Sequence, residues 1–347
     1  MSLQFRPTSP ADEPAVAAFL REIFAIDASL PLTAPRHLHW KNWEERPDWP
    51  GSRGYILTKD SAIVAHGTVV PLSYVYGEQH ARMVHVIDWA ADPKSVGSGV
   101  ILMRNIFRLT DAVLAIGGSD MTQKVLPSLG FRAYGEVTSF VRPLRPLRRL
   151  TQGPLTLRAG AQVARSLLWS LQAPSGSVQG WTANRIAPGQ VAAQSIPWPR
   201  GGEQTALFER TPDQMAALLR CPVTPMELYT VAKGAATRGY FLLAHAPGQT
   251  RIADFSIDSQ DPADWRVLIQ LAVAQAEQNP AAVELASMGS EAVTRQALLD
   301  CGFHPRGEAA IRILHGKQMT FPAGSIRFQM IDNDFAYLHQ NRNEYWA

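Results

Sequence analysis

The feature that most constrains the fold is an internal repeat. Residues 112–136, AVLAIGGSDMTQKVLPSLGFRAYGE, return with small length changes as residues 282–308, AVELASMGSEAVTRQALLDCGFHPRGE. Each copy has the pattern of a strand, a Gly or Ser turn, a helix, a Gly-Phe pair and a further strand. The repeat predicts an α/β protein with two related halves, with a separate sheet in each half or one continuous sheet across both.

The elements expected around each copy support this organisation. In the first half we expect strands at residues 3–6, 55–57, 62–71, 82–89 and 112–116, and helices at residues 12–24 and 100–108. In the second half, strands are expected at residues 239–246, 251–257 and 283–286, with a helix capped by Asp261. A strand, a helix and a strand in succession are typical of a right-handed parallel crossover.

A basic connector separates the halves. Residues 142–166 contain six arginines, three prolines and no acidic residue, and residues 174–202 have the composition of loops. We expect domains at residues 1–141 and 203–347, joined by a linker with a helix at residues 155–171. A basic amphipathic helix can also lie on an anionic membrane. A solvated linker with a packed helix is favoured, because this segment also holds many small neutral residues.

Composition excludes several classes of protein. Hydrophobic residues make up 46% and charged residues 18% of the chain, which is typical of a globular protein. No apolar run is long enough to span a membrane, and the N-terminus lacks a signal peptide's apolar core, so we expect a cytoplasmic protein. Two cysteines, Cys221 and Cys301, are too few for a disulfide framework. A net charge of +3 does not indicate a nucleic-acid partner.

The segment with the clearest chemistry is DWAADPKSVGSGVILMRNIF, residues 88–107. An expected strand runs into a loop with the spacing K-x-x-G-x-G, formed by Lys94, Gly97 and Gly99, and a helix follows at once. Glycines let the backbone approach a ligand closely, and the free amides and positive dipole of a helix start favour a phosphate. The pattern therefore predicts an anion site, although an ordinary strand-to-helix turn has the same composition.

This part of the sequence resembles, in order and spacing, the acyl-CoA-binding part of the GNAT N-acetyltransferases. The resemblance is carried by the loop, the crossover helix, the strand at residues 112–116 and the helix that ends in Leu129, Gly130 and Phe131. The resemblance covers residues 3–141 and, more weakly, residues 229–312, so the chain resembles a tandem GNAT protein with two mixed-sheet domains. The resemblance implies that the loop amides bind the pyrophosphate of acetyl-CoA, while the preceding strand binds the pantetheine arm. The implied cofactor-binding residues are Trp89, Ala90, Ala91, Lys94, Ser95, Val96, Gly97, Ser98 and Gly99.

Two features depart from the family pattern. Leu126 stands where many relatives have a tyrosine that protonates the leaving thiolate. The second copy has Ser259, Gln260, Asp261, Pro262, Ala263 and Asp264 in place of the Gly loop. Carboxylates at a helix start repel phosphate and a proline removes an amide donor. We therefore expect one CoA site, in the first half.

Acyl transfer to an amine needs a base for the amine proton and a donor for the carbonyl oxygen. His85 and Asp88, on the strand before the loop, are the candidate catalytic residues. Alternation places them on opposite faces, with Asp88 on the face of Val84 and Val86, so His85 is favoured for the acceptor side. The competing interpretation of His85 is a buried histidine with a structural role.

Three tryptophans, Trp40, Trp43 and Trp49, lie among acidic residues in the region that covers the acceptor in the resembling fold. They predict either an aromatic wall for a sugar or cationic amine, or ordinary packing. No metal site is expected, because His37 and His39 are not spaced for one helix face.

The resulting hypothesis is a GNAT-type N-acetyltransferase. It would move an acetyl group from acetyl-CoA to the amino group of a small molecule or amino sugar by direct attack. The alternatives are a Fem-type aminoacyl transferase, against which Gly97 and Gly99 count, and a non-catalytic CoA-binding or scaffold protein.

Overall fold

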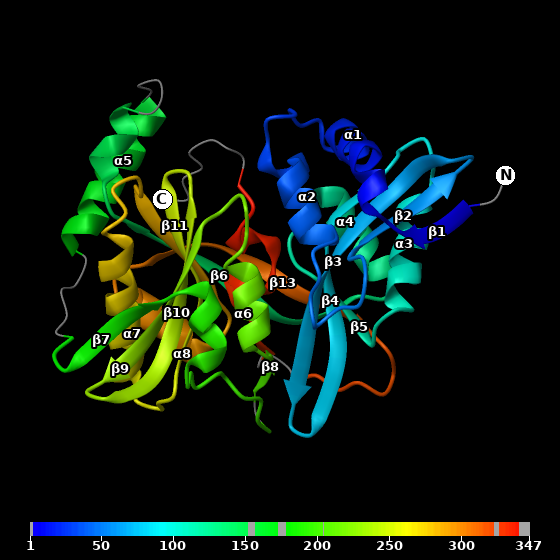
Figure 1. Ribbon diagram of the computed structural model, residues 1–347. Coiled ribbons are helices and arrows are strands. Elements are labelled where there is room, and N and C mark those ends of the chain that lie inside the picture. Colours follow the sequence, from blue (N-terminus) through cyan, green and yellow to red (C-terminus); the bar gives the residue numbers. More distant parts are fainter. Residues whose placement is uncertain (1–2, 152–156, 173–177, 204, 323–325, 340–347) are drawn as a thin grey trace.

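A single sheet organises the computed structural model, which describes residues 3–151, 157–172, 178–203, 205–322 and 326–339. Its 14 strands follow the order β1-β2-β3-β4-β5-β13-β6-β12-β11-β10-β9-β7, with β8 paired to β3 and β14 paired to β8 (Figure 1). Parallel and antiparallel pairs both occur, so the predicted α/β fold with a mixed sheet is confirmed.

The first half contains the strands and helices β1 (Leu3–Pro7), α1 (Glu13–Phe24), α2 (Pro35–Asn42), β2 (Gly54–Lys59), β3 (Ala62–Tyr76), β4 (Gln79–Ala91), α3 (Ser98–Phe107), β5 (Ala112–Ala115), α4 (Asp120–Ser128) and β6 (Arg132–Pro143). The helices expected at residues 12–24 and 100–108 are therefore present as α1 and α3. Alternation explains how β2 serves two cores. Tyr55 and Leu57 pack with α3, and Ile56 packs on the opposite face with α1 and α2.

The rest of the chain contains α5 (Leu157–Gln172), β7 (Trp181–Ile186), β8 (Ala206–Phe208), α6 (Pro212–Leu218), β9 (Met226–Lys233), β10 (Ala236–Ala246), β11 (Gln249–Ile257), α7 (Pro262–Ala276), β12 (Glu284–Gly289), α8 (Ala292–Asp300), β13 (His304–His315) and β14 (Ile326–Arg327). Residues 181–186, expected to be a loop, form the edge strand β7, which pairs with β9. Only its ends, Trp181 and Ile186, are buried, so the polar residues between them did not indicate a strand.

No helix among the described residues has the length and apolar character of a membrane span.

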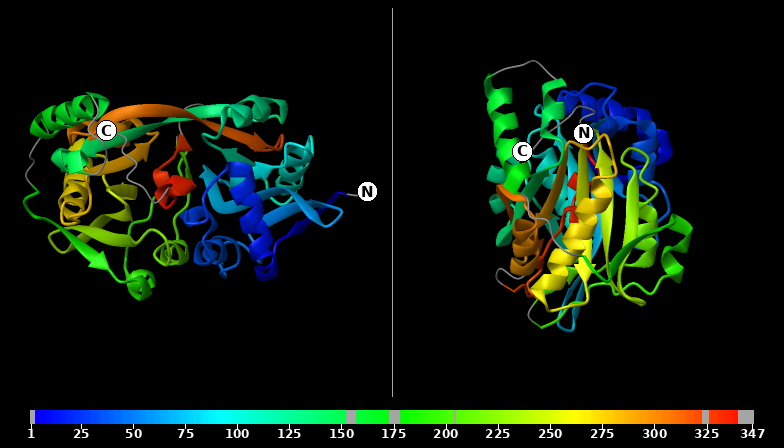
Figure 2. Two further views of the ribbon diagram at one scale, coloured as in Figure 1. Left: turned by 90° about the horizontal axis from the view of Figure 1, so that it is seen from above. Right: turned by 90° about the vertical axis from the view of Figure 1, so that its left-hand side faces the viewer.

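The two halves repeat one order of elements and exchange one strand each. The order β4-α3-β5-α4-β6 in the first half matches β11-α7-β12-α8-β13 in the second. The strand β13 lies between β5 and β6, and β6 lies between β13 and β12. Figure 2 shows β6 and β13 running side by side across both halves. One continuous sheet therefore joins the halves, and the expected boundary after residue 141 falls inside β6.

The C-terminal segment lies where the halves meet, within a core made by residues of both. This central core includes Trp40 of α2, Leu114 of β5, Tyr240 of β10 and Met330 and Tyr337 of the C-terminal segment. Figure 1 shows this segment, in red, at the centre of the molecule. These buried contacts pack the end of the described chain against both halves.

Candidate functional site

The strands β4 and β5 diverge, and the region between their diverging ends is here called the cleft. The two strands pair in parallel through only three residue pairs, which end at His85 and Leu114. Beyond that point β4 continues to Ala91, whereas Gly117 and Gly118, both at positive φ, carry the chain away after β5. Backbone groups on this edge of β4 therefore have no β5 partner and can bind an extended ligand.

A β-bulge at Asp88 reshapes β4 next to this cleft. Ile87 pairs with Thr68 and Ala90 with His66, so β4 has one extra residue, and Asp88 has a φ of +49°. The bulge turns Asp88 away from the α3 face of Val84 and Val86. The prediction that Asp88 shares their face was wrong, because the alternation on which it rested stops at the bulge.

Asp88 instead forms a buried ion pair with Lys41 of α2. The two side chains are 3% and 2% exposed, although Asp88 as a whole residue is only half-buried. The exposed part of Asp88 is therefore its backbone, which lies at the splayed edge of β4. The exposed backbone at the bulge can contact a ligand that lies along this edge.

The loop before α3 has the features of an anion site. Gly97, at φ +83°, is the N-cap of α3, with no side-chain cap and no acidic residue in the first turn. Among the described residues, the amides of Val96 and Gly97 have no hydrogen-bond partner, and both residues are exposed. Unpaired amides at a positive helix end favour a phosphate. Lys94 is also exposed and can add a positive charge.

The other predicted cofactor-binding residues shape the loop. The Ser98 hydroxyl donates to the carbonyl of Val64, and the Trp89 indole donates to the carbonyl of Gly99 at 3.1 Å. A Cβ on Gly99 would lie 3.1 Å from the Cβ of Ala91, so a side chain here would force α3 and β4 a few tenths of an ångström apart. Ser95 accepts from the Ser98 amide through its carbonyl, and Ala90 is buried against α1 and α2.

His85 is placed less favourably for catalysis than predicted. It is 4% exposed, and burial lowers its pKa to about 4, although a hydrogen bond to the backbone of Asp332 acts in the opposite direction. The Nδ1 atom has no partner among the described residues. His85 is therefore neutral at physiological pH and has little contact with solvent.

A carboxyl group that the sequence did not reveal lies in the C-terminal segment. Asp334 is half-buried, and removal from water together with the negative charge of Asp88 raises its pKa to about 7, against the opposing charges of Lys41 and Arg251. The adjacent Phe335 is 39% exposed, and its ring lies 3.9 Å from the position that a Cβ on Gly117 would occupy. Asp334 is therefore beside both the bulge and the turn after β5. No motif marks it, because its position depends on the packing of the chain end.

The equivalent cleft of the second half is closed by the chain itself. The strands β11 and β12 pair through residues 249–252 and 284–287 and then separate. The Gln329 side chain occupies the gap, where it accepts from the Phe255 amide at 2.7 Å and donates to the Phe255 carbonyl at 2.8 Å. Asp261 caps α7 by accepting from the Ala263 amide, and Asp264 lies in the first turn.

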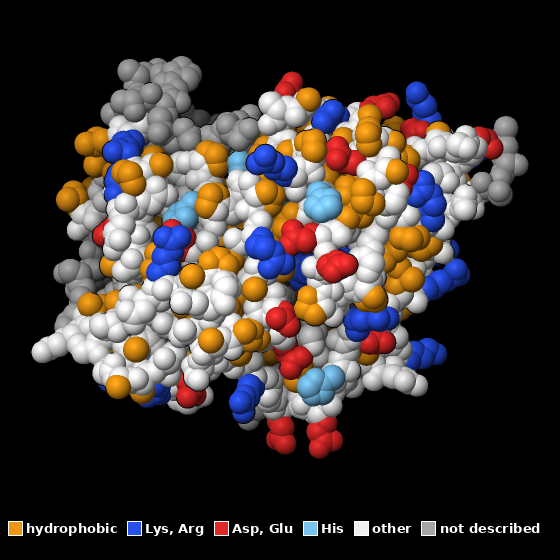
Figure 3. Space-filling model, in the orientation of Figure 1, with side chains coloured by type: hydrophobic (Ala, Val, Ile, Leu, Met, Phe, Trp, Pro, Cys, Tyr) orange, Lys and Arg blue, Asp and Glu red, His pale blue; other side chains and the backbone are white. Residues whose placement is uncertain are grey.

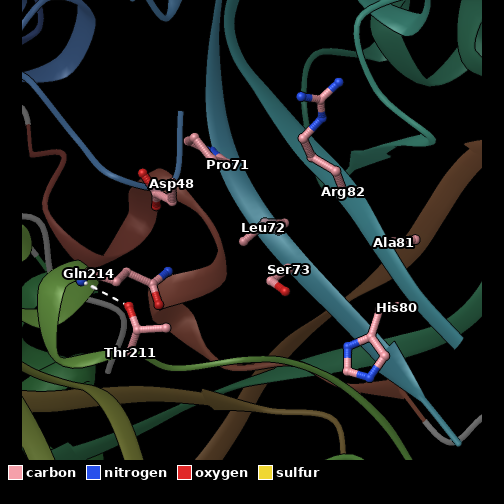
Figure 4. A pocket seen from close by; sticks show the side chains of 9 residues that line it. All are labelled: Asp48, Pro71, Leu72, Ser73, His80, Ala81, Arg82, Thr211 and Gln214. Atoms are coloured by element: carbon pink, nitrogen blue, oxygen red, sulfur yellow. Dashed lines mark hydrogen bonds between the residues drawn. The ribbon is translucent and has the colours of Figure 1, made fainter. Parts of the chain in front are cut away.

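A groove with both apolar and polar side chains in its lining lies between the halves. A cavity of about 400 Å³ is lined by Asp48, Pro71, Leu72, Ser73, His80, Ala81, Arg82, Thr211 and Gln214 (Figure 4). Gln214 also lines a smaller hollow with Trp40, Lys41 and Tyr337. Figure 3 shows charged side chains and histidines along the middle of this face.

The three tryptophans have packing roles. Trp40 is 7% exposed and donates to the carbonyl of Ala217. Trp43 donates to Thr8, and Trp49 is 4% exposed, so packing explains much of the tryptophan cluster.

Leu126 also has a packing role. It is fully buried in the core between α3 and α4, together with Met103 and Phe131. The position at which the resembling family often has a tyrosine therefore presents no acid to the cleft.

Solved structures of low sequence identity share this architecture. No protein-family model matches the sequence. The search of curated proteins also finds no match. A GCN5-related N-acetyltransferase from Anabaena variabilis superposes with a TM-score of 0.58 at 11% identity, over 90% of this chain and 72% of that chain. Saccharomyces cerevisiae N-myristoyltransferase with bound myristoyl-CoA gives a TM-score of 0.62 at 11% identity, over 93% and 80%.

A putative acetyltransferase from Pyrococcus horikoshii gives a TM-score of 0.53 at 10% identity, over 98% of this chain and 96% of that chain. These likenesses agree with the resemblance carried by the Gly loop and the crossover. The chain has the fold of the GCN5-related N-acetyltransferases and N-myristoyltransferases.

Proposed function

We propose that the protein is an acyltransferase that moves an acyl group from acyl-CoA, most simply acetyl-CoA, to the amino group of a small polar molecule. The observation that carries this proposal is the splay of β4 from β5 beside an uncapped helix start with unpartnered amides. A strand edge and an anion site in this arrangement suit a ligand with an extended amide-bearing arm and a pyrophosphate. Acyl-CoA has both.

In this proposal the loop amides of Val96 and Gly97 bind the pyrophosphate, with Lys94 nearby. The pantetheine arm lies along the free edge of β4, and the thioester carbonyl points to a backbone amide of the bulge at Asp88 and Trp89. The acceptor amine then attacks the thioester directly. The chain contributes positioning and a preorganised hydrogen-bond donor for the developing oxyanion, and no covalent enzyme intermediate is required.

The groove between the halves supports a polar acceptor. Its lining combines hydroxyl, amide, imidazole and charged groups from Ser73, Thr211, Gln214, His80 and Asp48. These groups can bind the hydroxyls of an amine such as an amino sugar, while Pro71, Leu72 and Ala81 can contact its carbon skeleton. The alternatives are a non-catalytic CoA-binding protein and a Fem-type aminoacyl transferase, and the open anion loop favours CoA over aminoacyl-tRNA.

Release of the CoA thiol tests the proposal. The purified protein is mixed with acetyl-CoA or myristoyl-CoA, with glucosamine or spermidine as the amine, and thiol release is followed with a colorimetric thiol reagent. We expect amine-dependent release with acetyl-CoA and glucosamine. Amine-dependent release with myristoyl-CoA but not with acetyl-CoA would show that the donor is a long-chain acyl-CoA. Binding of acyl-CoA without thiol release for any combination of donor and amine would favour the non-catalytic alternative.

A further inference from the structure

We infer that the second half contains a binding site for a neutral saccharide, in a cavity beyond its closed cleft. This outer cavity has a volume of about 830 Å³, about twice that of the groove between the halves. Its lining comes from the segment before β8, from β8, the end of β11, the loop before α7, the start of α8 and β14. The inference goes beyond the proposed acyl transfer and does not depend on it.

The outer cavity begins where the Gln329 plug ends. Gln329 binds the backbone of Phe255 in β11, whereas the next residues of the chain, 256–258, line the outer cavity. The start of α8 contributes Glu291 to the same lining. Because β11 and β12 pair only through residues 249–252 and 284–287, their later parts leave room for a ligand on the outer side of Gln329.

Charged side chains of the outer cavity have unused hydrogen-bonding capacity. Arg327 donates from Nη2 to the Phe255 carbonyl at 2.7 Å, and its Nε lies 3.4 Å from Glu291 Oε2. Its Nη1 has no hydrogen-bond partner among the described residues, and the buried Oε2 of Glu291 accepts no hydrogen bond. Asp258 and Arg200 are exposed, and their side chains have no partner in the described part of the chain. A ligand can therefore bind to carboxylates and guanidinium groups together.

The mixed charge of the lining favours an uncharged ligand. A phosphate could bind to Arg200 or Arg327, but it would lie near the carboxylates of Asp258 and Glu291. A polyamine could bind to the carboxylates, but it would lie near the two guanidinium groups. A hydroxyl both donates and accepts, so it can pair with either kind of group. A polyhydroxylated neutral ligand therefore avoids like-charge repulsion here.

Ring side chains supply the apolar part of the lining. Trp198 is half-buried, and its ring packs edge-on against Tyr240 with the ring centroids 4.7 Å apart. Pro197 and Pro199 lie on either side of it in the chain and also line the outer cavity. Flat apolar surfaces can contact the C–H faces of sugar rings while the charged groups bind the hydroxyls. The volume, the rings and the mixed charges together suit a short neutral oligosaccharide.

Isothermal titration with trisaccharides tests the site. The protein is titrated with maltotriose, cellotriose, mannotriose and triacetylchitotriose, which differ in linkage and stereochemistry. All four are neutral and have no free amine, so the proposed acyl transfer cannot use them as acceptors. We expect saturable binding of at least one of them. Absence of binding by all four would overturn the inference.

Removal of the Trp198 ring should weaken this binding. Trp198→Ala should lower the affinity for the bound trisaccharide by about tenfold, because the apolar contact is lost. Trp169→Ala is the matched control, since Trp169 is also half-buried but lies in α5, where it stacks on His304. It should bind normally. Unchanged affinity in a folded Trp198→Ala variant would overturn the assignment.

A surface variant keeps the test valid if Trp198→Ala does not fold. Asp258→Ala removes an exposed carboxylate without a partner, so its effect on folding is small. It should lower the affinity by about tenfold, because a charged hydrogen-bond acceptor is lost. Glu136→Ala, at an exposed position in β6, is the control and should bind normally. Equal affinities in the two variants would contradict the inference.

A spectroscopic readout locates the saccharide. In protein labelled with ¹⁵N at the tryptophan indoles, the resonance missing from Trp198→Phe identifies Trp198. This resonance should shift during the trisaccharide titration. Saturable binding that leaves it unmoved would place the saccharide elsewhere, as in the groove between the halves, and would overturn the inference. A larger affinity for spermidine or inorganic phosphate than for any trisaccharide, at the same resonance, would contradict the charge argument.

The proposed acyl transfer fails or holds separately. Gly97→Trp alters the loop before α3, so it should lose acetyl-CoA binding and keep wild-type affinity for the trisaccharide. Loss of trisaccharide binding in this folded variant would contradict a site in the second half. Failure of the wild type to bind acetyl-CoA would overturn the proposed function and leave the saccharide site standing.

Discussion

The two strand–helix–strand units differ most at the starts of α3 and α7. The start of α3 has a positive-φ glycine, no side-chain cap and unpartnered amides, whereas the start of α7 has the Asp261 cap, Pro262 and Asp264. The adjoining clefts also differ. Gln329 fills the cleft of the second half, whereas the cleft of the first half is bordered by an edge of β4 that has no β5 partner. One fold element can thus have the features of an anion site or be a capped structural helix, depending on a few side chains.

The comparison also shows that the halves are not independent. The segment that closes the second cleft continues to Asp334 at the first, and the strands β6 and β13 are interleaved. Damage to the anchors of this segment should therefore affect both halves at once.

The largest expected effect on stability comes from Arg210. Its guanidinium binds Asp254 at 2.8 Å and Asp332 at 2.7 Å, and all three side chains are 4% exposed or less. Arg210→Met removes the positive charge from two buried carboxylates, which keep only hydrogen bonds from Tyr240 and the Gln329 amide, and should lower the free energy of unfolding by about 3–5 kcal/mol. Urea denaturation measures this. The triple variant Arg210→Met, Asp254→Asn, Asp332→Asn should recover part of the loss, and no recovery would contradict the electrostatic explanation.

Removal of the Gln329 amide should have a smaller effect. Gln329→Ala leaves the buried amide and carbonyl of Phe255 without these hydrogen bonds, and should cost about 2 kcal/mol of unfolding free energy. Thermal or urea unfolding measures the loss, with Gln260→Ala, an exposed glutamine, as the control. The variant should still bind one acyl-CoA per chain, because the carboxylates at α7 remain. A second binding site would show that Gln329 alone closes the second cleft.

The smallest effect is expected at the cap of α7. Asp261→Ala removes the hydrogen bond that the Ala263 amide donates at 2.8 Å, and should cost about 1 kcal/mol of unfolding free energy. Acyl-CoA affinity should not change, because this helix start is not the proposed CoA site. Weaker acyl-CoA binding by the folded variant would contradict the division of roles between the two helix starts.

The sequence predicted what depends on local pattern. The spacing of Lys94, Gly97 and Gly99 between an apolar strand and an apolar helix identified the loop before α3. The residues Asp261, Pro262 and Asp264 identified its altered counterpart. The repeat predicted two related halves, and the helices and most strands appear within a few residues of the predicted ranges. These features follow from spacing, capping residues and turn composition, which are local properties.

What the sequence did not predict depends on tertiary contacts. Asp88 lies on the other face of β4 because of a bulge at which its φ is positive. An aspartate in the sequence does not by itself predict that conformation. The exchange of β6 and β13 requires pairing across 170 residues, as at Thr138 and Glu308. Gln329 acquires its role only when the chain end packs between the halves. Strand β7 was missed because only its two ends are apolar.

Isothermal titration of the protein with acetyl-CoA tests the central claim most directly. We expect one molecule bound per chain. Gly97→Trp should abolish binding, because a large side chain at φ +83° blocks the loop amides. Gly180→Trp is the matched control, since Gly180 has a φ of +77° and equally open surroundings at the edge of the second half, and it should bind normally. Undiminished binding by a folded Gly97→Trp variant, or two molecules bound per chain, would contradict the account.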